Sequence, residues 1–339
     1  MKILKTKLLL YFLICILTFA FFNKAFASTD FLTVPKGVRS AGMGGAYIAL
    51  AEGPETVFYN YAATPKLKGF YANLEYGQFL ETNYFTLAGQ NLFDYSPLRW
   101  GYIYAFSDNI PYTFLNELGY PEATGTSFGY STHTGYLSHN TNWLDFELGL
   151  GLEAHLEALA TQNANTISLG GSLQRSIDLA GDMLTCAITF KNFLSTNTTW
   201  STGTKDTIPY NIIYGISYKT KDNKFNLNLD FSTETARLYN WNLITDYYAG
   251  MEYWWHGTLT NKYGSAIRAG FNKTNFAFGI GLNIDGLIFN CAYLLPQKSY
   301  LDANFRFSIG WSAHPFEVEI QKKSRIEQEM EKLLDTFDL

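Results

Sequence analysis

The feature that most constrains this chain is an alternation of apolar and polar residues with a period of two, from about residue 70 to residue 311. In one such stretch, Phe146, Leu148, Leu150 and Leu152 alternate with acidic residues, glycine and histidine. Successive side chains of a β-strand point to opposite faces, whereas a helix repeats every 3.6 residues. The pattern therefore predicts an all-β fold.

About fourteen runs of this kind follow one another, separated by turn-forming residues such as those at 140–142 and 285–286. Strands of roughly 9–11 residues with one apolar face are typical of transmembrane β-barrels. The predicted strands cover residues 70–78, 83–91, 99–106, 127–138, 143–156, 166–176, 183–192, 209–219, 224–233, 247–256, 265–272, 275–283, 286–294 and 302–312.

Composition separates a membrane barrel from a soluble β-sandwich. The chain of 339 residues is 17% aromatic and 16% charged, whereas soluble domains carry about 25% charged residues. A sandwich would cover its outer faces with Lys, Thr and Glu, but the polar positions here are mainly Gly, Ser and Asn. We therefore expect an antiparallel transmembrane barrel of about 14 strands over residues 70–314. Its interfacial aromatic girdles would include Trp100, Trp143, Trp254, Trp255 and Trp311.

The first 27 residues have the pattern of a secretory signal peptide. Lys2, Lys5 and Lys7 precede an uncharged apolar run, and Ala25-Phe26-Ala27 is a cleavage signal. A retained membrane anchor is the alternative. Cleavage would leave 21 basic and 30 acidic residues, a formal net charge of −9, which disfavours nucleic-acid binding. Export and a barrel together predict the bacterial outer membrane.

A glycine-rich segment at residues 28–69 precedes the first strand. Its G-x-G-G sequence lacks the lysine and hydroxyl of a phosphate loop, so nucleotide binding is not expected. Glycine lets backbone pack closely against backbone. We therefore expect this segment to be a hatch, or plug, in the barrel.

The hatch segment contains two motifs, Arg39-x-x-Gly42-Met43-Gly44-Gly45-Ala46 and Tyr59-Asn60-x-Ala62. They resemble the N-terminal signature of FadL-like outer-membrane proteins, the PorV/PorQ branch above all. Tyr61 departs from this pattern, because proline is usual there. Weaker matches follow in the family's order at 190–193, 206–209 with 215–218, 250–254 and 267–271.

The resemblance implies a fourteen-stranded barrel with an N-terminal hatch, and it leaves two functions open. One is passage of hydrophobic solutes, such as long-chain fatty acids, across the outer membrane. The other is a non-enzymatic, PorV-like component of a protein secretion or surface-attachment machine. It implies these hatch residues, structural or gating in role: Arg39, Gly42, Met43, Gly44, Gly45, Ala46 and Asn60.

Two further segments are assigned by pattern. The long connection 107–126 is apolar enough to line a solute entrance. Residues 315–339 follow the last strand and have a helical apolar face. They are expected to form a periplasmic tail, either solvated or docked on the barrel rim or a periplasmic partner protein.

Catalytic chemistry finds little support in the sequence. His155 lies between Glu153 and Glu157 on one predicted strand face, but a single strand rarely builds a closed site, so a hydrated lumen lining is the plainer interpretation. Cys186 and Cys291 show no metal-binding spacing. We expect no enzyme, no cofactor and no metal site, with the lipid bilayer and hydrophobic small molecules as partners.

Overall fold

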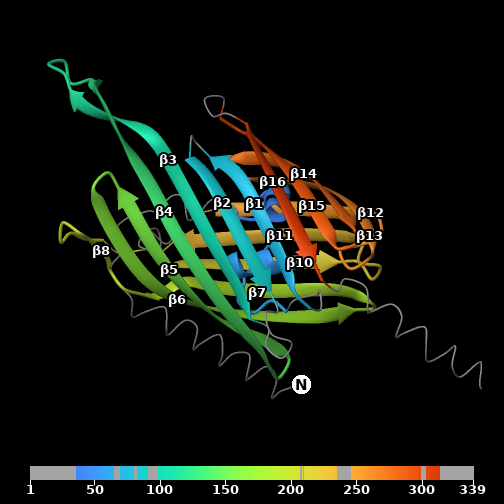
Figure 1. The fold of residues 1–339 in the computed structure, drawn as a ribbon. Coiled ribbons are helices and arrows are strands. Elements are labelled where there is room, and N and C mark those ends of the chain that lie inside the picture. The colour runs from blue at the N-terminus through green and yellow to red at the C-terminus, as the bar shows by residue number, and fades with distance from the viewer. Residues whose placement is uncertain are drawn as a thin grey trace, which may run out of the picture.

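The computed structural model describes residues 36–64, 69–79, 82–90, 98–206, 208, 210–234, 246–298 and 303–313. The signal peptide and the C-terminal tail, both predicted above, lie outside these residues. Within them, fourteen long strands form a closed antiparallel β-barrel (Figure 1). These are β1 (Tyr71–Phe79), β2 (Thr82–Gln90), β3 (Arg99–Leu115), β4 (Pro121–Trp143), β5 (Phe146–Leu159), β6 (Gln162–Leu179), β7 (Asp182–Ser195), β10 (Asn211–Lys219), β11 (Phe225–Glu234), β12 (Asp246–His256), β13 (Tyr263–Asn272), β14 (Asn275–Ile284), β15 (Leu287–Pro296) and β16 (Asn304–Ser312).

The ring closes because β1 pairs with β16 and β5 pairs with β6. Each strand otherwise pairs with its neighbour in sequence, except that β7 pairs with β10. The short strands β8 (Thr198–Trp200) and β9 (Lys205–Asp206) add a flap on the edge of β6. The predicted fold class and strand number are therefore confirmed.

Apolar side chains face outward and small or polar side chains face inward. On β14, Phe278 and Ile280 are 54% and 52% exposed, whereas Ala277 and Asn283 are each 1% exposed. A closed ring has no unpaired edge and satisfies its backbone hydrogen bonds internally, which membrane-spanning structures require. No helix in the described ranges is both long and apolar enough to cross a membrane.

The prediction of a loop at 107–126 is wrong for most of that stretch. Strand β3 continues to Leu115 and β4 begins at Pro121, so the two form a ribbon that extends beyond the ring (Figure 1). Ile110 pairs with Phe128, and the ladder shifts register on either side of Ile110 and Pro111. These irregularities accommodate a proline, which cannot donate to a ladder. They also interrupt the strict alternation, so the sequence pattern does not reveal the strands in this stretch.

The assignment of Trp254 to an aromatic girdle is also wrong. Trp255 faces outward and is 48% exposed, but its neighbour Trp254 is 2% exposed and points into the barrel. There it packs with Tyr71, Leu259 and other buried side chains. Adjacent residues of a strand face opposite sides, so only one of the two can lie in a girdle.

Candidate functional site

The candidate site is the barrel interior, which contains residues 36–63 of the same chain, here called the lumen segment. It includes the helix α2 (Val38–Gly42), which contacts β13 to β16, and the 3-10 helix η2 (Pro54–Phe58), which contacts β1 to β4. Both lie inside the ring in Figure 1. Every residue of the segment is buried except Tyr59, which is half-buried.

An ion-pair cluster joins the lumen segment to the wall. Arg39 donates to both carboxylate oxygens of Glu252 on β12, with Nε–Oε1 at 2.8 Å and Nη2–Oε2 at 2.6 Å. Arg268 on β13 donates from Nε to the same Oε1 at 2.7 Å. All three side chains are at most 5% exposed. A bidentate arginine–carboxylate pair fixes orientation as well as distance, so the cluster positions α2 on β12 and β13.

The cluster extends through Glu52 of the lumen segment. Its Oε2 accepts from Arg39 Nη2 at 3.0 Å, and its Oε1 accepts from Lys219 on β10. The hydroxyl of Tyr47 donates to the Glu52 carbonyl. The buried cations and anions therefore alternate, which offsets the desolvation cost of each.

Two wall carboxylates bind backbone N–H groups of the lumen segment. Asp230 Oδ2 on β11 accepts from the N–H groups of Tyr47 and Ile48, at 2.5 and 2.8 Å. Glu75 Oε2 on β1 accepts from the N–H of Gly37 at 2.7 Å. Buried backbone donors need partners, and these carboxylates supply them where the segment is not regular.

A second set of contacts holds the end of the segment. Arg99 on β3 donates to the carbonyls of Tyr61 and Ala63. The Tyr61 hydroxyl donates to Glu153 on β5, whose Oε2 lies 3.5 Å from His155 Nε2. His155 is 5% exposed and lies edge to face with Tyr136, so this face of β5 is packed and does not line an open lumen.

Glycines on the inner wall admit the backbone of the lumen segment. A Cβ at Gly279 on β14 would lie 3.0 Å from Gly42 Cα. A Cβ at Gly250 or Gly270 would overlap the backbone of Met43. Since a backbone atom cannot move aside as a flexible side chain can, these wall positions require glycine.

Burial also alters two ionisable groups of the segment. It raises the pKa of Glu55 to about 7, although Asn73 donates to this carboxyl at 2.6 Å. Burial lowers the pKa of Lys36 to about 7. Desolvation penalises the charged form in both cases.

The residues expected in the hatch motif all lie in the lumen segment, in two places. Arg39 and Gly42 to Gly44 contact β12, β13 and β14. Gly45, with φ 93°, donates its N–H to the Ser40 carbonyl, and Ala46 follows it, fully buried. Asn60 lies apart, where its Nδ2 donates to the Ile48 carbonyl at 2.9 Å and to Gln174 at 2.6 Å. The structure places these residues but assigns them no gating role.

Sequence reasoning missed the wall residues that bind the segment. They occupy inward positions in the alternation, where the composition suggested only small neutral residues with scattered charges. One sequence feature does mark these wall residues: each is a charged residue at an inward position of a strand whose outward residues are apolar. They are Glu75, Arg99, Asp230, Glu252 and Arg268. In the described part of the chain, no three His, Cys, Asp or Glu residues are placed to hold a metal ion.

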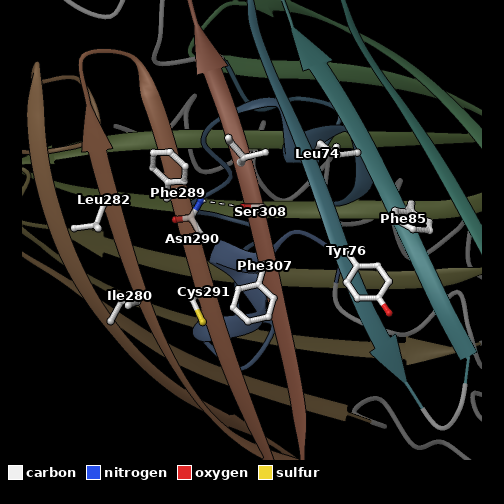
Figure 2. A pocket seen from close by; sticks show the side chains of 11 residues that line it. Leu74, Tyr76, Phe85, Ile280, Leu282, Phe289, Asn290, Cys291, Phe307 and Ser308 are labelled. Atoms are coloured by element: carbon white, nitrogen blue, oxygen red, sulfur yellow. Dashed lines mark hydrogen bonds between the residues drawn. The ribbon is translucent and has the colours of Figure 1, made fainter.

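The outer wall carries a shallow apolar groove of about 420 Å³ across β14, β15, β16, β1 and β2 (Figure 2). Phe289, Phe307, Leu74 and Tyr76 rise around it, and the smaller Cys291 leaves the hollow between them. The groove belongs to the outward face and is separated from the lumen by the sheet.

No protein-family model matches the chain, and no curated protein matches its sequence. Solved structures do match. The Pseudomonas putida toluene transporter TodX aligns with a TM-score of 0.51 and 11% identity, over 82% of this chain and 97% of that chain. A TodX deltaS2S3 mutant, a monoaromatic hydrocarbon channel, aligns with a TM-score of 0.50 and 10% identity, over 81% and 97%. At this identity the likeness is one of fold: the chain forms a barrel similar to that of TodX.

Proposed function

We propose that this protein is an outer-membrane channel for small hydrophobic molecules and that the lumen segment is its closure. The observation that carries the proposal is a plug made by the chain itself. It docks on the wall through side-chain contacts and is not part of the sheet, so it can move without breaking the barrel. The fold likeness to a toluene transporter supports the same function.

The outward face supports a membrane location. Nine of the strands, β1, β2 and β10 to β16, are 9–11 residues long, which suits a tilted strand crossing a bilayer. Their outward side chains are large and apolar, as on β16, where Phe305, Phe307, Ile309 and Trp311 are 47–57% exposed. Such a continuous apolar surface would aggregate in water.

Apolar contacts inside the barrel support a hydrophobic solute. Tyr59, the half-buried residue of the lumen segment, packs against three separate apolar clusters of segment and wall residues. Ile213 on β10, also half-buried, packs against one of them. On the protruding ribbon, Tyr112 and Phe128 lie with ring centroids 4.7 Å apart. We place the solute path along the ribbon to Tyr59.

Uptake into vesicles tests the proposal. Protein reconstituted in liposomes is expected to admit long-chain fatty acids or monoaromatic hydrocarbons, and to exclude a sugar of similar size. Deletion of the lumen segment is expected to raise sugar permeation, because the barrel then lacks its closure. Uptake of none of the apolar probes by intact, folded barrel would contradict the proposal.

A secretion-machine component remains the second candidate, and one observation favours it. The tip of the β3–β4 ribbon exposes large apolar side chains, with Leu115, Leu118 and Tyr120 at 72%, 80% and 65% exposed. The FadL-like part of the sequence resemblance is compatible with the barrel, while the TodX likeness gives no support to the PorV/PorQ branch. Co-purification of a translocon protein that depends on residues 110–128, with no apolar uptake, would favour this alternative.

A further inference from the structure

The apolar groove on the outer wall lies at the depth where a bilayer contains only hydrocarbon. It follows a row of outward side chains that pair from strand to strand across the closing seam of the ring, where β16 meets β1 (Figure 2). β15 runs from Leu287 to Pro296, so Cys291 is in its middle. Outward positions in the middle of a membrane-spanning strand face the hydrocarbon core. The row consists of Ile280, Cys291, Phe307, Tyr76 and Phe85.

The hollow exists because Cys291 is small. Its neighbours on the row, Ile280 and Phe307, are 52% and 53% exposed, and Phe289 on its own strand is 38% exposed, so all three stand out from the wall. Between them the groove has a volume of about 420 Å³. An acyl chain on a smooth wall is contacted from one side, whereas a chain in this hollow is also contacted from its flanks. Dispersion contacts add up, so the groove holds a chain more tightly than the wall around it.

The lining offers little to a polar or charged ligand. The Cys291 thiol is only a weak hydrogen-bond donor, and the Tyr76 hydroxyl already donates to Asn83 Oδ1 at 2.9 Å. Asn290 and Ser308 also border the groove, but they are buried on the lumen side of the sheet, where Asn290 Nδ2 donates to Ser308 Oγ at 3.2 Å. The groove therefore selects its ligand by shape and apolar contact.

Length and curvature favour an acyl chain over a second copy of the barrel. The row crosses five strands, and four interstrand spacings of about 4.8 Å make it about 19 Å long. One leaflet contributes about half of a hydrocarbon core that is about 30 Å thick, so one extended acyl chain of that leaflet fits along the groove. A second barrel presents another convex wall, which touches the rims of the groove and leaves the hollow empty.

The two ends of the barrel indicate which leaflet supplies the chain. At the end where β1 begins, the connections between long strands range from two residues (144–145) to eight (91–98), whereas the β3–β4 ribbon and the flap of β8 and β9 lie at the other end. Short turns are periplasmic and long loops extracellular in such barrels. On β14 and β15 the groove comes within two residues of the periplasmic strand ends, at Leu282 and Phe289. It therefore opens toward the periplasmic leaflet, which consists of phospholipid.

We propose that the groove is a binding site for one acyl chain of a phospholipid in the periplasmic leaflet, and that Cys291 is the small residue that admits the chain. The bound chain contacts Phe307 on β16 and Tyr76 on β1, so it packs on both sides of the closing seam. The proposal rests on the membrane location of the wall and not on transport.

Native mass spectrometry of the full-length protein tests the proposal. Delipidated barrel in detergent micelles is titrated with dipalmitoyl phosphatidylethanolamine, and the fraction that retains one lipid is measured. C291F fills the hollow and is expected to lower retention roughly tenfold, the factor that about 1.4 kcal/mol gives. C186F is the matched control, because Cys186 is an exposed thiol on β7, outside the groove. It should retain the lipid as the wild type does.

Two further variants keep the test independent of one substitution. I280W narrows the hollow from β14 and should act like C291F, while C291A leaves the hollow open and should retain the lipid. Folding of each variant is checked by the heat-dependent shift in gel mobility. Equal retention by wild type and a folded filling variant, or no retention by wild type, would overturn the proposal. So would a wild-type dimer that C291F abolishes, since the groove would then belong to a second copy. Lipid retention is measured without transport, so its failure is distinct from a failure of uptake.

Discussion

Arg39 of the lumen segment and Glu252 of β12 form a buried bidentate ion pair, with the guanidinium Nη2 2.6 Å from Oε2 and Nε 2.8 Å from Oε1. The two residues are 213 positions apart in the chain. Arg268 shares the same carboxylate. One acidic side chain thus balances two cations and ties the segment to the wall.

E252Q is expected to loosen the lumen segment. It leaves Arg39 and Arg268 buried without the carboxylate they share, and breaking a buried pair costs about 3–5 kcal/mol. Ion conductance in planar bilayers should rise, and A49C, on a C186S C291S background, should become reactive to maleimide. E117Q, at the exposed ribbon tip, is the control. Unchanged conductance and reactivity in E252Q would show that the pair does not hold the segment.

G270A is expected to displace the lumen segment. The added Cβ would overlap the Met43 carbonyl carbon and the Gly44 nitrogen, and overpacking costs about 1–3 kcal/mol even where side chains can adjust. Limited proteolysis should cleave the segment faster than in the wild type. G135A is the matched control, since a Cβ there meets nothing within 4 Å. Equal cleavage of the two variants would contradict the close packing.

W254A and W255A should differ sharply although the residues are adjacent. Trp254 lies in a buried cluster with Tyr71, Leu259 and Ile288, so its removal is expected to cost about 3–5 kcal/mol. Trp255 faces outward, and its loss should cost far less. Urea unfolding in lipid vesicles, followed by gel mobility, measures both. Similar midpoints would place Trp254 outside the core.

Docking of the lumen segment should weaken as pH rises from 5 to 7. Burial raises the pKa of Glu55 to about 7, above the usual range, so the folded state binds this proton more tightly than the unfolded state. The protonated Glu55 carboxyl therefore contributes up to about 3 kcal/mol to docking. This contribution is complete below about pH 4.5, falls between pH 4.5 and 7, and is lost above pH 7. Lys36, with its pKa lowered to about 7, stays charged in the unfolded state and begins to lose its proton in the folded state only near pH 7.

E55Q isolates this effect, because an amide keeps the donor–acceptor shape of the protonated carboxyl and does not titrate. Maleimide attacks the thiolate, so the reactivity of A49C is divided by that of a free thiol at the same pH. This ratio should rise with pH in the parent and stay flat when E55Q is added. If the reactivity of A49C still depends on pH in this way when E55Q is present, another titrating group causes the change.

The alternation of residues determined the wall of this protein. The predicted strand 275–283 corresponds to β14 at 275–284, and 224–233 corresponds to β11 at 225–234. Strand periodicity is local, and an apolar outward face needs no partner from elsewhere in the chain, so it can be read from the sequence. The β3–β4 ribbon does not follow from the alternation, because register shifts at Ile110 and Pro111 break that local pattern.

Only the tertiary structure decided what fills the barrel. The sequence marks Arg39 and the glycines after it, but their partners Glu252 and Gly279 are more than 200 residues away and look like ordinary inward positions. The same holds for Asp230, which binds the backbone of Tyr47 from 183 positions away. Which inward residue meets the segment depends on the register of every strand around the ring. Trp254 is a second example. A shift of the strand register by one residue would move its side chain from the buried core to the outward girdle, and the sequence does not fix that register.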